Sequence, residues 1–259
     1  MDQALPLAIL VEHLSKRFDK VLAVDDISFA VPQGEFFGFL GPNGAGKSTT
    51  IRVLCGLLRA EYQSIVVAGH DLRSNPLGVK ASIGVMLEEP VLYERLSARE
   101  HLCFTGQLYG LSATQASTRG EELLGLLGLA DDADRLIIDY SQGMRKKVAL
   151  ACALIHAPPV LFLDEPFSGI DTVTSRQIKK LLRARVEQGV TILFSSHVME
   201  VVERLCTGLA IIHRGRIVFA DTMANLRARL DFKSLEDVFI AAVGADEITH
   251  ADDESWLAS

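Results

Sequence analysis

The chain has 259 residues, of which 49% are hydrophobic and 23% are charged. This length and apolar content are enough for one substantial core with a smaller lobe attached. The formal net charge of −7 argues against broad contact with phosphate backbones, so no nucleic-acid partner is expected. We find no run near the roughly 20 apolar residues of a membrane-spanning helix and no leader pattern. Four scattered cysteines fit reduced core residues in a cytosolic protein.

The first part of the chain is predicted to form strands. Residues 8–40 contain short runs of Val, Ile, Leu and Phe, broken at Pro32-Gln33-Gly34, which is typical of antiparallel strands with a turn. The last run, residues 35–40, is nearly all apolar and indicates a strand buried on both faces of an α/β sheet. Helix-spaced apolar residues follow at 47–58, so a glycine-rich loop lies between a strand and a helix.

Helical periodicity returns at residues 97–128, which open with the capping-box pattern of Ser97 and Glu100. This stretch predicts an inserted helical lobe. Short apolar runs separated by helical patterns then indicate a parallel sheet in an α/β core, at residues 160–163, 191–194, 209–212 and 217–220. The final residues, 245–259, are acidic and poor in apolar side chains, so we expect them to be disordered.

The loop at residues 41–48 matches the phosphate-binding pattern G-x-x-x-x-G-K-[ST]. Its glycines allow successive backbone N–H groups to face phosphate oxygens, while Lys47 adds a compact positive charge. The hydroxyl of Ser48 is placed to face a magnesium ion. A chance glycine turn is the plainer alternative, but the strand before the loop and the helix after it favour the motif. The predicted ATP-binding residues are Gly41, Pro42, Asn43, Gly44, Ala45, Gly46, Lys47, Ser48 and Thr49.

Two carboxylates, Asp164 and Glu165, follow the apolar run Val160–Leu163. Ligands bind at strand ends in open α/β sheets. Asp164 suits magnesium, which prefers hard oxygen ligands, and Glu165 suits a general base for the water that attacks the γ-phosphate. Alone, such a pair is more often an ordinary charge at a loop or helix start; its position after the phosphate-binding loop favours the catalytic interpretation.

Together with residues 140–144, Tyr-Ser-Gln-Gly-Met, these motifs resemble the nucleotide-binding subunit of an ATP-binding-cassette transporter, over about residues 8–244. The family signature is usually Leu-Ser-Gly-Gly-Gln, so Tyr140 and Gln142 are departures. The resemblance implies that Ser141, with Gln142 and Gly143, meets the γ-phosphate held by an opposite subunit in a head-to-tail dimer with two shared sites. A simple capped helix would be favoured if the other motifs were absent.

The resemblance extends to three further positions. Residues 166–171 resemble the loop that crosses the dimer interface, here with Ser168, Gly169 and Asp171. His197 matches the switch histidine that contacts the γ-phosphate, which implies a catalytic role beside Glu165 and Lys47. Phe18 lies where the family has an aromatic residue that stacks on adenine, although an ordinary strand-edge aromatic is the alternative.

The largest departure from the family pattern is Glu88, where a glutamine usually touches magnesium and the attacking water. A glutamate still supplies an oxygen, so the implied magnesium ligands are Ser48, Glu88 and Asp164. The neighbouring Glu89 is left open as the contact residue.

The resemblance implies an α/β fold: a P-loop NTPase core with a mixed sheet, an N-terminal antiparallel β-subdomain and an inserted α-helical subdomain at about 95–140, all within residues 1–244. It also implies an ATPase that uses ATP and Mg²⁺, dimerises with itself or a related subunit, and drives a separate integral membrane permease. The subunit would be cytoplasmic and peripheral on the inner face of the cell membrane, and its glycine-rich loop, signature and lobe resemble the exporter branch. One alternative is a soluble cassette ATPase acting on the ribosome, nucleic acid or cofactor assembly, and another is a regulator that no longer hydrolyses ATP.

Overall fold

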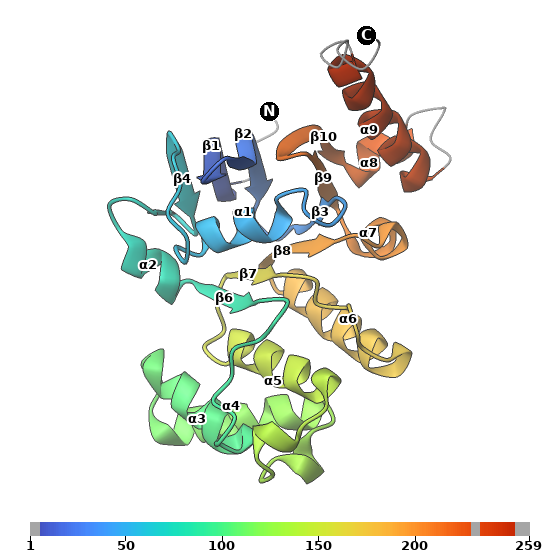
Figure 1. The fold of residues 1–259 in the computed structure, drawn as a ribbon. Coiled ribbons are helices and arrows are strands. Elements are labelled where there is room, and N and C mark those ends of the chain that lie inside the picture. The colour runs from blue at the N-terminus through green and yellow to red at the C-terminus, as the bar shows by residue number, and fades with distance from the viewer. Residues whose placement is uncertain (1–5, 229–233, 252–259) are drawn as a thin grey trace.

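The computed structural model describes residues 6–228 and 234–251, with side chains up to residue 244. It contains two sheets (Figure 1). An antiparallel sheet in the order β2-β1-β4-β5 is built from β1 (Leu7–Phe18), β2 (Val21–Pro32), β4 (Ser64–Val67) and β5 (His70–Asp71). A mixed sheet in the order β10-β9-β3-β8-β7-β6 is built from β3 (Phe36–Leu40), β6 (Ile83–Met86), β7 (Val160–Leu163), β8 (Thr191–Ser196), β9 (Gly208–His213) and β10 (Arg216–Thr222).

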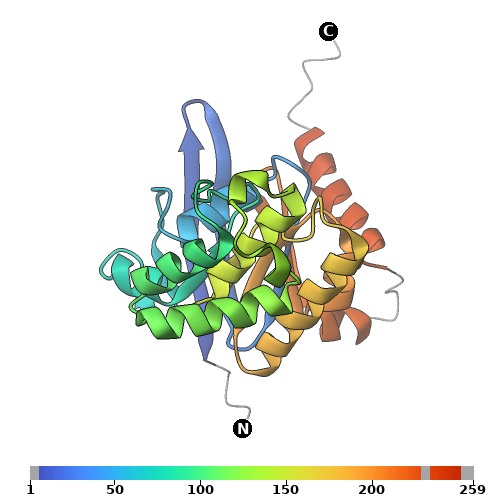
Figure 2. The same cartoon turned by 90° about the horizontal axis from the view of Figure 1, so that it is seen from below.

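Helices cover the mixed sheet on both faces. The helix α1 (Lys47–Leu54) lies between the two sheets. The opposite face carries a helical lobe, which Figure 2 shows in front of the strands. The lobe and its neighbours comprise α3 (Ala98–Leu108), α4 (Ala113–Leu126), two short 3-10 turns (Ala130–Asp132 and Ile137–Asp139) and α5 (Gln142–Leu154). The remaining helices are α2 (Pro76–Ala81), α6 (Thr172–Glu187), α7 (Met199–Leu205), α8 (Met223–Ala228) and α9 (Leu235–Ala251).

Two hydrophobic cores form on the two faces of the mixed sheet because successive strand residues point to opposite sides. In β3, Phe37 and Phe39 pack with α1 and the antiparallel sheet, whereas Phe36 and Leu40 pack with the helical lobe side. The same alternation separates Phe162 from Leu163 in β7. The nearly continuous apolar strands predicted from the sequence are therefore buried on both faces.

The topology brings four chain segments to one edge of the mixed sheet. Strands β3, β8, β7 and β6 are neighbours and run parallel, so their carboxyl ends lie side by side. The glycine-rich loop follows β3, Asp164 and Glu165 follow β7, His197 follows β8 and Glu88 comes shortly after β6. This edge is where a doubly covered α/β sheet binds its ligand.

The expected fold class is confirmed: the chain is α/β, with an antiparallel N-terminal sheet and a mixed sheet. Two details differ. The helix α1 ends at Leu54 instead of continuing to residue 58, because Gly56 adopts a left-handed φ of 66° that ends a helix. The helix α9 runs to Ala251, so the expected disorder from residue 245 is wrong for residues 245–251, which contain neither glycine nor proline. Residues 252–259 of that tail lie outside the described residues.

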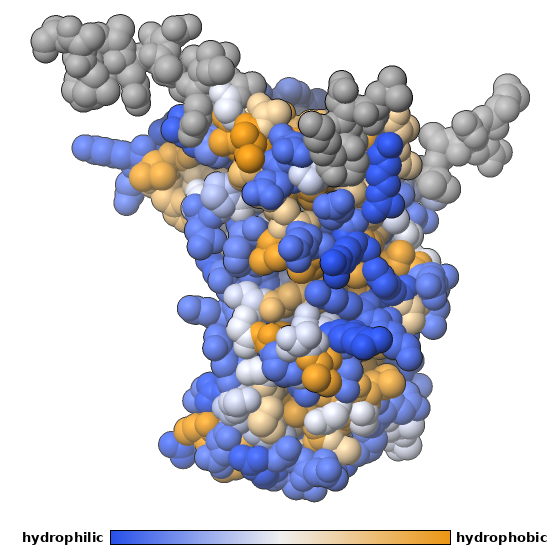
Figure 3. Space-filling model, turned by 90° about the vertical axis from the view of Figure 1, so that its right-hand side faces the viewer, coloured by the Kyte–Doolittle hydropathy of each residue, from blue (hydrophilic) through white to orange (hydrophobic). Residues whose placement is uncertain are grey.

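On the face drawn in Figure 3, apolar side chains lie in separate patches among polar ones. Within residues 6–228 and 234–251, no helix combines the length and the apolar character needed to cross a membrane.

Gly84 in β6 packs directly against the backbone of α5. A β-carbon there would lie 2.0 Å from the carbonyl oxygen of Ala153 and 2.6 Å from Cδ2 of Leu161. We expect Gly84→Ala to lower the free energy of unfolding by about 1–3 kcal/mol, because backbone must move to admit the methyl group. Chemical denaturation measures this effect.

Gly125 in α4 is the matched control, because a β-carbon there meets no atom within 4 Å. Gly125→Ala should keep or raise the stability, since alanine favours helix over glycine by about 1 kcal/mol. Equal stability changes in the two variants would contradict the packing argument.

Candidate nucleotide-binding and catalytic site

The phosphate-binding loop is held tightly between β3 and α1, and two of its glycines are required by close contacts. Gly46 has a left-handed φ of 109°, and a β-carbon on it would lie 2.5 Å from the carbonyl oxygen of Ala23. A β-carbon on Gly41 would lie 2.3 Å from the carbonyl oxygen of Ile212. The helix α1 begins at Lys47, directly after Gly46. The unpaired N–H groups of its first turn therefore open toward the loop.

Lys47 is buried, and its ammonium lies inside the curve of this loop. Its Nζ donates to the carbonyl oxygens of Gly41 at 2.7 Å and Pro42 at 3.0 Å. The same Nζ is 3.6 Å from Oε1 of Glu165. A positive charge is thus fixed between the loop and the carboxylate that follows β7.

Asp164 is fully buried at the end of β7 and is held by two hydroxyl groups. Its Oδ1 accepts hydrogen bonds from Ser48 Oγ at 3.0 Å and from Ser195 Oγ at 2.6 Å. Its buried Oδ2 has no hydrogen-bond partner among the described residues. A buried carboxylate oxygen without a donor is costly unless a ligand satisfies it, and with the Ser48 hydroxyl beside it the set suits Mg²⁺.

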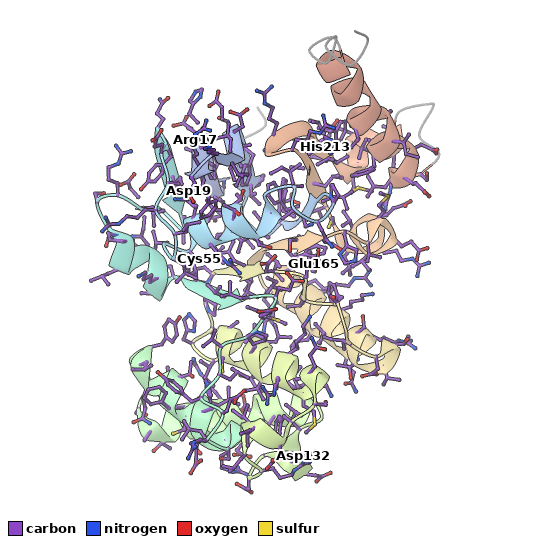
Figure 4. All side chains as sticks on the ribbon, viewed as in Figure 1. Arg17, Asp19, Cys55, Asp132, Glu165 and His213 are labelled. Atoms are coloured by element: carbon purple, nitrogen blue, oxygen red, sulfur yellow. The ribbon has the colours of Figure 1, made fainter. Side chains whose placement is uncertain are left out.

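Glu165 is placed by a strained backbone and by charged neighbours. Its φ of 47° is in the left-handed region, which costs energy for a residue with a β-carbon and is often found at functional sites. Its N–H donates to Ser195 Oγ at 2.8 Å. Its carboxylate oxygen Oε1 lies 3.0 Å from Nδ1 of His197. Figure 4 shows Glu165 near the centre of the molecule, between the mixed sheet and the helical lobe.

These residues border a pocket of about 320 Å³, a volume that suits the phosphate end of a nucleotide. The lining residues are Ala23, Asn43, Gly44, Gly46, Lys47, Ser48, Thr49, Glu88 and Glu165. Glu88 is thus brought to the pocket, whereas Glu89 is not part of this lining. A magnesium contact by either glutamate stays a prediction.

Phe18 is not part of this lining, which includes Ala23 of β2. The Phe18 ring is 44% exposed at the end of β1. The ammonium of Lys16 lies 4.8 Å from the ring centroid, a cation–π contact on the aromatic face. An adenine-stacking role for Phe18 stays a prediction.

The signature residues lie away from this pocket. Ser141 is the N-cap of α5, accepting a hydrogen bond from the Met144 N–H at 3.3 Å, and it is exposed together with Gln142. Neither these two nor Gly143 belongs to the lining of the phosphate pocket in the described chain. An exposed helix N-terminus leaves backbone N–H groups open to an anion from outside.

The expected interface loop lies beside the signature in the same chain. A β-carbon at Gly169 would be 3.6 Å from Oε1 of Gln142. Asp171 caps α6 by accepting a hydrogen bond from the Thr174 N–H at 2.9 Å. Hydrogen bonds from Thr174 hold the pKa of Asp171 below its ordinary value. Asp171 thus has a structural role that does not depend on a dimer.

Three residues of the site were not singled out by the sequence. Ser195 bridges Asp164 and Glu165, Ala23 lines the pocket, and the buried Lys146 donates to the carbonyl oxygen of Glu165 at 3.3 Å. Lys146 lies two residues after the signature stretch 140–144 and Ser195 two residues before His197, but their contacts depend on how strand and helix pack.

The fold and this constellation define a P-loop nucleotide-binding protein. The model of the family described as "ABC transporter" matches residues 24–168, and the chain belongs to this family. It is 38% identical over 238 residues to the ABC transporter ATP-binding protein NatA of Bacillus subtilis (strain 168), covering 90% of this chain and 97% of that protein. It is 38% identical to the daunorubicin/doxorubicin resistance ATP-binding protein DrrA of Streptomyces peucetius, covering 86% and 68%.

A solved structure of an ATP-binding subunit of an ABC transporter superimposes with a TM-score of 0.84 at 31% identity. The match covers 91% of this chain and 99% of that chain. Fold and sequence similarity therefore extend well beyond the phosphate-binding loop.

The Ser195 bridge generates a prediction for stability. We expect Ser195→Ala to lower the free energy of unfolding by about 1–3 kcal/mol, because it leaves a buried N–H of Glu165 without an acceptor and removes a donor to Asp164. Thermal and chemical denaturation measure the change. Ser196→Ala is the control, because within the described part of the chain the Ser196 hydroxyl bonds only to the nearby backbone of Val198. A larger loss of stability in Ser196→Ala than in Ser195→Ala would contradict the bridging role assigned to Ser195.

Proposed function

We propose that this chain hydrolyses ATP and thereby drives transport, as export, by a separate integral membrane permease. The observation that carries the proposal is the position of Glu165, whose buried carboxylate lies 3.6 Å from Lys47 Nζ and 3.0 Å from His197 Nδ1 at the phosphate pocket. A carboxylate in this position can accept a proton as a general base, and Lys47 and His197 orient it from two sides.

The roles of the chain's own residues follow from their contacts. The N–H groups of the glycine-rich loop and the first turn of α1 hold the phosphates. Lys47 turns its ammonium from the loop carbonyls to the β- and γ-phosphates. Ser48, Asp164 and Glu88 would hold Mg²⁺, which would neutralise charge on the phosphate oxygens.

Hydrolysis then needs a water molecule aligned with the γ-phosphorus. Glu165 accepts a proton from this water as the water oxygen bonds to the γ-phosphorus, while the bond from that phosphorus to the β–γ bridging oxygen breaks and ADP is the leaving group. The Nδ1–H of His197 donates to Glu165 Oε1, which fixes the orientation of the imidazole ring beside the carboxylate; this tautomer is assigned from the hydrogen bond.

A second subunit completes the site in this proposal. Ser141 and the N-terminus of α5 are exposed, and the phosphate pocket of the same chain does not include them. Two copies, or one copy and a related subunit, would therefore bind two ATP molecules between them, each between the loop of one subunit and the signature of the other.

Glu165→Gln tests the base and the dimer together. We expect ATP hydrolysis to fall by at least about a hundredfold, because the amide keeps the shape of the side chain but no longer accepts the proton. ATP binding should persist, and light scattering after size exclusion should show an ATP-dependent shift from 28.2 kDa to twice that mass. Glu187→Gln, at an exposed position on α6, is the control that should leave turnover unchanged.

The signature is tested in the same trapped variant. Ser141→Arg added to Glu165→Gln should abolish the shift in mass, because a bulky cation would fill the signature surface. Ser112→Arg replaces another N-cap serine, at α4, and should leave the dimer intact. Parental turnover in Glu165→Gln would contradict the base assignment, and a dimer that survives Ser141→Arg would contradict the shared site.

The permease is proposed to dock on an apolar groove that follows Glu88. The groove has a volume of about 420 Å³ and is lined by Leu92, Tyr93, Glu94, Arg95, Leu96 and Phe104. Apolar side chains are exposed in the groove and next to it along the chain: Tyr93 of the lining is 61% exposed, and Val91, which precedes the lining residue Leu92, is 91% exposed. An exposed apolar groove with a charged rim fits a short helix or loop at the cytoplasmic side of a membrane protein.

Val91→Asp tests this docking surface without disturbing the core. We expect binding of the chain to inside-out vesicles from its own cells to weaken by about tenfold, or roughly 1.4 kcal/mol, because an unpaired charge would be buried at the contact. ATP hydrolysis by the isolated chain should not change. Leu77→Asp, at an exposed apolar position on α2, is the control and should bind the vesicles like the parent. Equal binding by Val91→Asp and the parent would contradict the proposed docking surface.

Export and location rest on the similarity to relatives. The printed name of DrrA refers to daunorubicin and doxorubicin resistance, and we propose that this chain likewise acts in export. It would then work in the cytoplasm, attached to the inner face of the cell membrane through its permease. The same similarity favours transport over the alternative of a cassette ATPase acting on the ribosome, nucleic acid or cofactor assembly.

A further inference from the structure

Lys146 is a buried lysine whose ammonium is bound by backbone oxygens. It lies on α5, five residues after the signature serine, and is 2% exposed. Its Nζ donates to the carbonyl oxygen of Ser168 at 2.5 Å and to that of Glu165 at 3.3 Å. Among the described side chains, no carboxylate lies within ion-pair distance of it. An ordinary core position would hold an apolar residue here, because burial of an ammonium is costly.

The surrounding charges belong to the nucleotide site. Burial lowers the pKa of Lys146, and the carboxylates of Glu88, Glu165 and Asp164 oppose that shift. Opposite charges favour the charged form of a buried group. The field of the site thus helps to keep the ammonium protonated.

The contacts on Glu165 show what this ammonium does. The Glu165 N–H is held by Ser195 Oγ at 2.8 Å, and its carbonyl oxygen accepts from both Lys146 and the Ser168 N–H, the latter at 3.2 Å. Both ends of a residue with a left-handed φ of 47° are therefore anchored. Fixing the backbone on both sides fixes the direction of the side chain.

We propose that Lys146 is a positioning residue for the catalytic carboxylate: by binding the carbonyl oxygens of Glu165 and Ser168, it holds Glu165 in its left-handed conformation against the phosphate pocket. This inference rests on the proposed role of Glu165 as the base. It also ties the helix headed by Ser141 to the loop that carries the base of the same chain. Each subunit thereby links the signature that it offers to a partner with its own catalytic residue.

The test compares Lys146→Met, Lys146→Arg and Lys180→Met in the full chain. We expect Lys146→Met to lower kcat for ATP about tenfold to a hundredfold, since small displacements of a catalytic group have effects of this size. Its KM should stay within about twofold, because the phosphate-binding loop is untouched. Lys146→Arg keeps the charge and its donors, so it should restore part of the loss. Lys180→Met, at an exposed position on α6, should match the parent.

Combination with Glu165→Gln separates positioning from a merely structural role. If Lys146 acts through Glu165, adding Lys146→Met to Glu165→Gln should leave the residual single-turnover rate unchanged, whereas independent effects would multiply. An unchanged kcat in Lys146→Met, or a further tenfold loss in the double variant, would overturn the inference. Parental hydrolysis in Glu165→Gln would instead overturn the proposed base itself.

Lys146→Gln provides a second variant in case the methionine variant does not fold. The amide keeps a donor for one carbonyl oxygen but has no charge, so its kcat should lie between those of the parent and Glu165→Gln, with KM again unchanged. A parental kcat in this variant would also overturn the inference.

Discussion

The burial of Asp164 at the end of β7 is the constraint on which the rest of the site depends. A fully buried carboxylate is tolerated only when hydrogen bonds or a cation compensate for the lost water. Hydrogen bonds from two hydroxyl groups provide part of this compensation: one comes from Ser48 in α1 and the other from Ser195 in β8. Because these donors come from different elements, the carboxylate joins the phosphate-binding loop, β7 and β8 into one arrangement.

The edge that carries these residues is rigid because both faces of the mixed sheet are packed. Its central strands are buried throughout, and the alternation of Phe162 with Leu163 assigns one side chain to each core. Loops positioned by such a scaffold hold functional side chains with little freedom. The left-handed backbone of Glu165 is sustained in this way, since a strained residue persists only when its surroundings over-determine it.

Local patterns were sufficient to predict the phosphate-binding loop and the Asp164–Glu165 pair, because each lies within one strand and the loop after it. Ser195 could not be assigned its contacts in that way. They depend on the pairing of β7 with β8, in which Leu163 lies opposite Phe194, so that the following residues meet. The contacts of Lys146 could not be predicted from local patterns either, because they depend on how α5 packs under the loop after β7. The acidic composition of residues 245–251 predicts disorder, but these residues contain no helix breaker and continue α9.

The first turn of α5 contacts three parts of the molecule that the proposed function uses. Arg145 donates from Nε to the carbonyl oxygen of Tyr140 at 3.3 Å and pairs with Glu94 of the apolar groove at 2.5 Å. The next residue, Lys146, holds the Glu165 loop from inside. A helix is stiff over one turn, so a displacement of the groove cannot leave the signature and the catalytic loop in place unless one of these contacts breaks. If the permease docks at this groove as proposed, coupling to hydrolysis would need no long relay, because Arg145, which contacts the groove, and Lys146, which contacts the Glu165 loop, are neighbouring residues of one helix.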